Sequence, residues 1–147
     1  MKGDTDVRFM VIVKADKNSE AGVMPTEQEL ATMGKYNQQL IDAGVMVDGA
    51  GLQPSSKGAR VGFKNGQVVV TDGPFAETKE LIAGYWIINV KSKAEAVEWA
   101  KKIPFQTLPH SGRDAEVEIR KFFEIEDFPN APADVVEQEK KHFGRPH

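Results

Sequence analysis

Extended and helical patterns alternate along this 147-residue chain in an order that leaves few folds open. The expected strands span residues 7–14, 45–53, 60–64, 67–72, 83–90 and 116–125. The first and fifth are largely apolar on both sides, which is typical of strands covered on both faces. Residues 116–125 alternate apolar and charged side chains, which indicates a strand covered on one face only.

Two capping boxes mark where helices begin. Thr26 and Glu29 open a helix predicted over residues 27–43, and Ser92 and Glu95 open a second helix. Apolar side chains and one amide recur at helical spacing on the first helix. They form its predicted buried stripe, which consists of Leu30, Met33, Asn37, Leu40 and Ile41.

Asn65 and Gly66 join two short extended runs, and this pair favours a type I′ hairpin turn because both residues tolerate positive φ. The order is then strand, helix, strand, hairpin, strand, helix, strand. Such a chain folds into a four-stranded antiparallel sheet with both helices on one face, the α+β ferredoxin-like plan. Residues 1–125 are expected to form this domain, and residues 126–147 a C-terminal tail with a short helix over residues 134–143.

The second face of the predicted sheet has no helix to cover it. Because two of its strands are apolar on both sides, another surface must bury this face. The same face of a second copy is the simplest cover. We therefore expect a homodimer in which two sheets meet as a dimeric α+β barrel.

Composition excludes several classes of function. The absence of cysteine excludes a thiol nucleophile, a disulfide framework and thiolate metal sites. A net charge of -3 argues against nucleic acid as a partner, because binders of polyanions normally carry a basic face. The longest apolar run, residues 82–90, is far short of a membrane helix, and no export signal is recognisable, so we expect a cytoplasmic protein.

Residues 72–80, with the sequence DGPFAETKE, are denser in candidate chemistry than any other stretch. Asp-Gly-Pro at a strand end is first a turn signal. The charges that follow predict a small-molecule site with these ligand-binding candidates: Asp72, Pro74, Phe75, Glu77, Lys79 and Glu80. Asp72 and Glu77 are the candidates for acid/base catalysis or for polar anchoring, with Lys79 as charge partner. The alternative is a stabilising turn and dimer contact.

Other motifs add little chemistry. The histidines His110, His142 and His147 lack metal-ligand spacing, so no metal site is predicted. His110 lies in a polar loop predicted over residues 106–115, either at the rim of a pocket or simply exposed. A second polar loop is expected at residues 16–22. The glycine-rich residues 49–54 lack the third glycine and the following helix of a dinucleotide loop, so no cofactor is predicted.

Residues 69–80, together with the sequence GYWII at residues 84–88, resemble the signature of the YCII-related superfamily, in the branch named for its DGPFAETKE (DGPF) motif. The resemblance covers residues 8–125. It implies a ferredoxin-like fold in a dimeric α+β barrel. Members of this superfamily are largely uncharacterised bacterial proteins.

The resemblance leaves two functions open. Some relatives have a pocket with a proposed His-Asp pair, and the wider barrel class includes enzymes that act on small cyclic substrates and lactones. This chain has no histidine in its first predicted helix, so that pair is not carried over. Other members are labelled as transcription-initiation proteins. The protein is thus either a small-molecule pocket protein, catalytic or only binding, or a non-enzymatic accessory or regulatory dimer.

Overall fold

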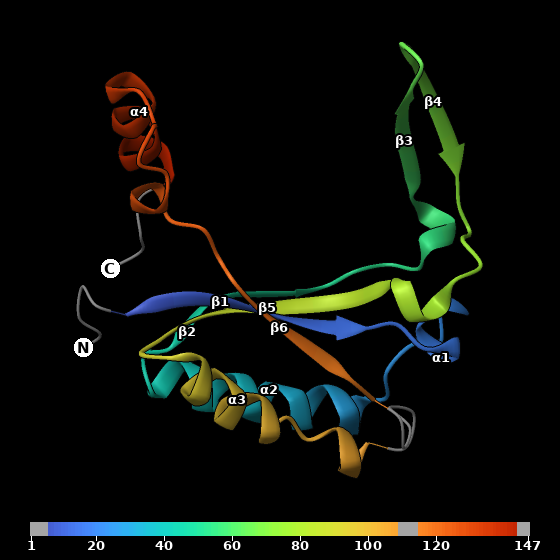
Figure 1. Cartoon of the computed structure of the whole chain (residues 1–147). Coiled ribbons are helices and arrows are strands. Elements are labelled where there is room, and N and C mark those ends of the chain that lie inside the picture. The colour runs from blue at the N-terminus through green and yellow to red at the C-terminus, as the bar shows by residue number, and fades with distance from the viewer. Residues whose placement is uncertain (1–5, 109–114, 144–147) are drawn as a thin grey trace.

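A four-stranded antiparallel sheet lies at the centre of the structure, a computed structural model that describes residues 6–108 and 115–143 (Figure 1). The strand order is β2-β5-β1-β6. The strands are β1 (Val7–Lys14), β2 (Met46–Gly51), β5 (Ile82–Val90) and β6 (Val117–Lys121). This α+β arrangement is compatible with the predicted ferredoxin-like fold.

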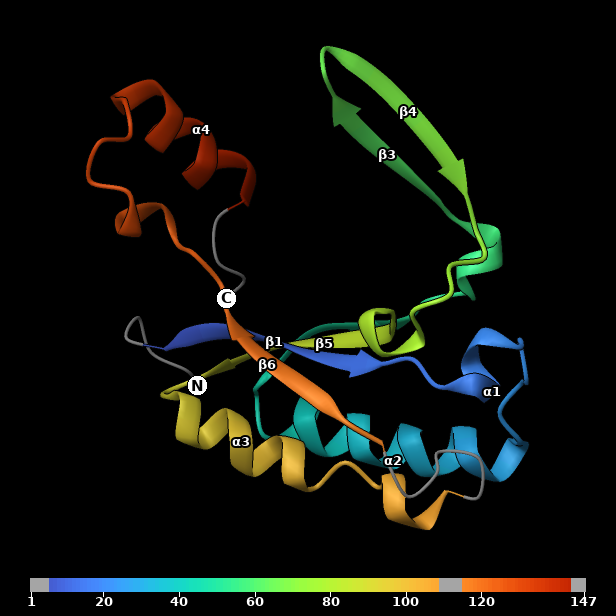
Figure 2. The same ribbon diagram turned by 45° about the vertical axis from the view of Figure 1, so that its right-hand side comes forward.

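Helices α2 (Glu27–Asp42) and α3 (Lys93–Lys101) cover one face of the sheet (Figures 1 and 2). The first predicted capping box is confirmed, because Thr26 Oγ1 accepts from the Glu29 N–H at 3.1 Å and Glu29 Oε1 accepts from the Thr26 N–H at 2.8 Å. Of the second predicted capping box, only one of the two hydrogen bonds forms. Ser92 Oγ accepts from the Glu95 N–H, whereas the Glu95 carboxylate accepts from the N–H of Lys91.

The core lies between these helices and the sheet. Its buried side chains include Phe9, Val11, Leu40, Ile88 and Val90. The predicted stripe of α2 was wrong in part, since Leu30 and Ile41 are exposed whereas Tyr36 is buried. Two contacts favour Tyr36: its ring packs edge-on against Trp86 at 5.5 Å between centroids, and its hydroxyl donates to Trp99 O at 2.7 Å.

Local capping explains two other differences from the sequence prediction. The loop expected at residues 16–22 contains a short helix, α1 (Lys17–Glu20), because Asp16 and Ser19 cap each other's backbone N–H. Strand β6 ends at Lys121, whereas the predicted strand ran to residue 125. It ends earlier because the chain turns into a 3₁₀ turn, η4 (Ile125–Asp127), whose first residue is 125. The Glu124 N–H donates to Asp127 Oδ2 at 2.8 Å and fixes this turn.

Two arms rise from the sheet face opposite the helices (Figures 1 and 2). The hairpin arm, residues 59–72, consists of β3 (Ala59–Lys64) and β4 (Gln67–Asp72), which pair only with each other. Asn65 (φ 51°) and Gly66 (φ 75°) form its turn, which confirms the predicted hairpin. The tail arm, residues 122–143, contains η4 and helix α4 (Ala133–Phe143).

The sheet face between the arms carries no helix. Met10 and Ile12 of β1 and Tyr85 and Ile87 of β5 point to this side and are half-buried. The structure contains one chain, so the predicted homodimer and barrel stay predictions. Within the described residues, no helix is long and apolar enough to cross a membrane.

Tyr36 gives the stability a specific pH dependence. Burial raises its pKa to about 12 from the ordinary value of 10.0. An unfolded tyrosine ionises near pH 10 whereas folded Tyr36 stays neutral, so its contribution is complete below pH 10 and is lost as the pH rises toward about 12. We expect urea unfolding of Tyr36→Phe to show a shallower loss of stability across this window than the parent protein.

The same variant loses about 1 kcal/mol at neutral pH, because Trp99 O loses its hydroxyl donor. Tyr85→Phe is the matched control, since the Tyr85 hydroxyl makes an exposed hydrogen bond to Asp48 at 3.3 Å and no other among the described residues. An equal alkaline slope in the parent and in Tyr36→Phe would contradict the assignment.

Candidate functional site

Residues 73–81 connect the hairpin arm to β5. The backbone at Gly73 lies so close to η1 (Ser55–Lys57) that a Cβ there would be 1.8 Å from Ser55 O, so only glycine fits. The Gly73 N–H donates to Gly58 O at 2.9 Å, and the Gly73–Pro74 peptide bond is cis. The segment is therefore a closely fitted joint at the base of the arm.

A hydrogen-bond network centred on Ser55 holds this joint. The Ser55 N–H donates to Glu20 Oε2 at 3.0 Å, and its hydroxyl donates to Glu20 Oε1. The same hydroxyl oxygen accepts from the Phe75 N–H at 3.0 Å. The Arg60 guanidinium lies 3.9 Å from the centroid of the Phe75 ring. Helix α1, η1 and the motif are thereby tied together, and we call this network the Ser55 joint.

The structure spreads the predicted site residues over this joint without gathering them. Asp72, Pro74, Glu77, Lys79 and Glu80 are exposed, and only Phe75 is half-buried. Among the described residues, no ion pair within 4.0 Å joins Lys79 to a carboxylate. Their role in ligand binding stays a prediction. His110 lies outside the described residues.

A cleft of about 330 Å³ lies beside the motif, between α2 and the sheet. Its floor is formed where Gly51 pairs with Gly84 and Gly49 pairs with Trp86. Glycine is required at Gly84, where a Cβ would lie 2.8 Å from Ala50 O, and it fits best at Gly49, where a Cβ would lie 3.0 Å from Trp86 Cδ1 and the indole would have to shift. The missing side chains leave a hollow on the side of the sheet that faces α2.

Apolar side chains and one amide close the cleft. Leu30, Met33 and Asn37 line it from α2, and Phe105 lines it from the chain that follows α3. A neighbouring cavity of about 200 Å³ shares Phe105 with it and adds polar groups near α1. The described surface offers no group of three histidine, aspartate or glutamate side chains that could hold a metal ion.

The orientation of the Asn37 amide is fixed by Trp86. The indole Nε1–H donates to Asn37 Oδ1 at 2.8 Å. Because an indole can only donate, the oxygen of the amide must face Trp86 and the NH₂ group must point elsewhere. Among the described residues no group accepts a hydrogen bond from the NH₂ group, so its two N–H donors remain available beside the cleft that Asn37 lines.

The sequence prediction placed Asn37 in the buried stripe of α2 and did not single out its amide as a candidate binding group. The available signal was a hydrogen-bonding amide at a position where the helical spacing called for an apolar residue. Glu20 and Ser55 carried no such signal, because they are 35 positions apart in the chain.

Ser55→Ala tests the joint. The change removes the donor to Glu20 and leaves the Phe75 N–H without its acceptor, so we expect a loss of about 1–3 kcal/mol in the free energy of unfolding. Urea denaturation measures it. Ser56→Ala is the matched control, exposed and expected to change stability by less than about 0.5 kcal/mol. Equal effects of the two substitutions would contradict the network.

Comparison with known proteins covers the sheet, its two helices and the hairpin arm. A family model of the YCII-related domain matches residues 7–123. The chain is also similar to the "Uncharacterized protein R00369" of Rhizobium meliloti (strain 1021), with 31% identity over 77 residues. That match spans 52% of this chain and 62% of the relative. Because the family match extends over most of its residues, the chain belongs to the YCII-related family.

Proposed function

We propose that this protein binds a small, mainly apolar molecule through a carbonyl or carboxylate oxygen in the cleft between α2 and the sheet. The observation that carries the proposal is the Asn37 amide, whose NH₂ group is directed away from Trp86. Two N–H donors on one nitrogen suit an oxygen acceptor. The apolar side chains of Met33 and Phe105 then contact the remainder of the ligand.

The size and position of the cleft agree with this role. Its volume of about 330 Å³ is at the lower end of the range for ligand pockets, roughly 300–1,000 Å³. Ala83 lines it and lies three residues after Glu80, so the cleft adjoins the end of the DGPFAETKE motif. That motif also supports assignment to the DGPF branch. In the single chain Asp72 and Glu77 are exposed and do not line this cleft, so the proposal is binding and does not rely on acid/base catalysis.

Asn37→Asp tests the proposal. Aspartate keeps an oxygen that accepts from Trp86 Nε1 but replaces both N–H donors by a negative charge. We expect cyclohexanecarboxylate to shift the amide resonances of Gly49 and Gly84 in an NMR titration. Its affinity should fall at least about tenfold in the variant, because a hydrogen bond to a charged group is lost and like charges then meet.

Two controls separate the site from general effects. Gln38→Glu adds the same charge at an exposed neighbouring position of α2 and should leave the affinity unchanged. Cyclohexylmethylamine has a similar apolar body but carries a cation, which the two donors do not favour. Equal binding of the carboxylate to the Asn37→Asp variant, or shifts confined to another surface, would refute the proposal.

The second candidate is a non-enzymatic accessory or regulatory homodimer, linked to transcription initiation as the family resemblance suggests. The observation that favours dimerisation is the open sheet face, where Met10 and Ile12 of β1 lie beside Tyr85 and Ile87 of β5. Burying this face against its copy would form the α+β barrel. Ligand binding and dimerisation are compatible, since the cleft lies on the opposite, helix-covered side.

Substitution of the motif carboxylates distinguishes a stabilising turn from a ligand site. Because both side chains are exposed, we expect Asp72→Asn and Glu77→Gln to change the free energy of unfolding by less than about 0.5 kcal/mol. Light scattering at micromolar concentration should give twice the chain mass of 16.2 kDa for the parent and for both variants. Large losses of stability and of dimer mass together would show that the carboxylates serve the fold and the dimer.

A further inference from the structure

The hairpin arm has one apolar face that no other described part of the chain covers. Val61 pairs with Val70, and Phe63 pairs with Val68, so these four side chains project to the same side. They are 53%, 64%, 78% and 63% exposed, in that order. An isolated two-stranded hairpin is only marginally stable in water. This face is therefore built to be covered.

The tail arm contains an apolar groove of about 550 Å³. The rings of Phe123 and Phe128 lie 4.9 Å apart at one side of it, and Val135 of α4 lines the other. Phe123 is 73% exposed and no residue of α4 is buried. Because an 11-residue helix is marginal on its own, α4 also lacks the packing that would stabilise it.

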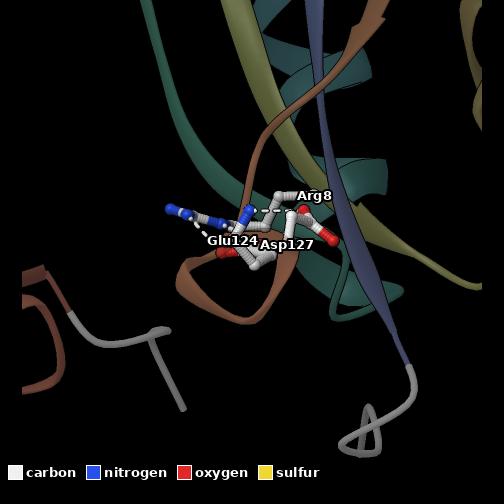
Figure 3. A network of polar contacts seen from close by, with 3 residues as sticks. All are labelled: Arg8, Glu124 and Asp127. Atoms are coloured by element: carbon white, nitrogen blue, oxygen red, sulfur yellow. Dashed lines mark hydrogen bonds and ion pairs between the residues drawn. The ribbon is translucent and has the colours of Figure 1, made fainter. Parts of the chain in front are cut away.

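A bidentate ion pair fixes the base of the tail arm (Figure 3). Arg8 Nε and Nη2 donate to the two carboxylate oxygens of Glu124 at 3.0 and 2.7 Å. The Glu124 N–H in turn donates to Asp127, and this turn fixes the direction in which the chain continues after β6. The groove is thus held above the open sheet face and is not free to fold back.

The two arms carry opposite charge. The hairpin arm, residues 59–72, contains Arg60 and Lys64 against Asp72, a formal charge of +1 (two basic less one acidic). The tail arm, residues 122–143, contains six acidic residues against Lys140 and Lys141, a formal charge of -4 (two basic less six acidic). The acidic residues are Glu124, Glu126, Asp127, Asp134, Glu137 and Glu139. Two copies of the hairpin would repel each other, whereas a hairpin and a tail arm attract.

The arms stand at opposite ends of the sheet strands. The hairpin arm joins β5 at Ile82, which pairs with Lys14 at the end of β1. The tail arm leaves β6 at Lys121, which pairs with Phe9 near the start of β1. Both arms rise on the open side (Figures 1 and 2). In both views (Figures 1 and 2) the two arms stand apart. Two copies can face each other through their open sheet faces about a twofold axis that is parallel to the sheet and perpendicular to its strands. This axis places each hairpin arm opposite the partner's tail arm.

We propose that two copies of this chain clasp each other, the apolar face of each hairpin arm docking in the tail groove of the other copy. The clasp rests on the homodimer proposed above and adds two identical contacts to the sheet interface. It buries the four apolar hairpin side chains against Phe123, Phe128 and Val135 and brings the basic arm to the acidic one. The groove lies almost wholly beyond residue 123, where the family match ends, so the clasp depends on residues outside the matched domain.

Site-directed cross-linking tests the clasp, because the parent protein contains no cysteine. The double variant Phe63→Cys, Val135→Cys is treated with a short bis-maleimide and run on a denaturing gel. We expect a covalent dimer from the double variant, and several-fold less from either single variant. Gln67→Cys with Val135→Cys is the matched control, since Gln67 projects from the polar face of the hairpin and should cross-link several-fold less.

Light scattering on the same samples separates the clasp from the dimer. A species of twice 16.2 kDa with a covalent dimer from the double variant supports both. The same mass without this cross-link overturns the clasp and leaves the homodimer intact. A covalent dimer from Phe63→Cys alone, as abundant as from the double variant, overturns the clasp in favour of hairpin-to-hairpin contact. A monomer overturns both.

A charge exchange provides a second measurement. Lys64→Glu places an acid on the hairpin and should weaken the dimer several-fold in dilution experiments at low salt. Glu139→Lys, at a groove position one helical turn after Val135, should restore part of the loss when it is combined with Lys64→Glu. Absence of any rescue, with both variants folded by circular dichroism, would contradict the pairing of these arms.

Discussion

The pairing of β1 with β5 is the contact on which the rest of this structure depends. It aligns Val11 with Trp86 and Phe9 with Ile88 on the helix side, where they form the centre of the core. The same register places Met10 beside Ile87 on the other side. Because side chains alternate along a strand, a pair of inner strands that is largely apolar on both faces is typical of a sheet covered on both sides. Helices α2 and α3 cover one face, and the arms frame the other.

The cleft is a consequence of how tightly β2 approaches β5. Gly49 and Gly84 permit that approach, and their missing side chains leave space beneath α2 that the core does not fill. Trp86 forms the boundary between core and cleft: its ring packs against Tyr36 and its Nε1–H is bonded to Asn37. A single residue thus joins the packing of the core to the polarity of the cleft.

Local signals in the sequence predicted most of the fold. The Asn65-Gly66 turn and the Thr26 capping box depend on residues within a few positions of each other, and both were confirmed. The order of the strands followed from the alternation of elements. Tyr36 was missed because its burial depends on a hydroxyl acceptor in α3, 63 residues away.

The candidate site was harder to predict for the same reason. The DGPFAETKE motif was recognisable from its residues, but its observed contacts are with Ser55, Gly58 and Arg60, which adjoin it only in the folded chain. The charges of the motif suggested a gathered site, whereas in the single chain they are spread over exposed positions. Charge density along a sequence does not say which side chains converge, because convergence depends on the path of the backbone between strands.

The Ser55 joint gives the hairpin arm a defined direction before any partner is present. Two connections leave the arm, through η1 and through residues 73–81, and Ser55 ties both to α1. Stacking of Arg60 on Phe75 adds a contact at the base of the arm. An arm fixed in this way loses little conformational entropy on docking, so modest apolar contacts can suffice for association. In the proposed dimer, the DGPFAETKE motif would act through the angle at which it holds the arm, although its charged side chains are exposed in the single chain.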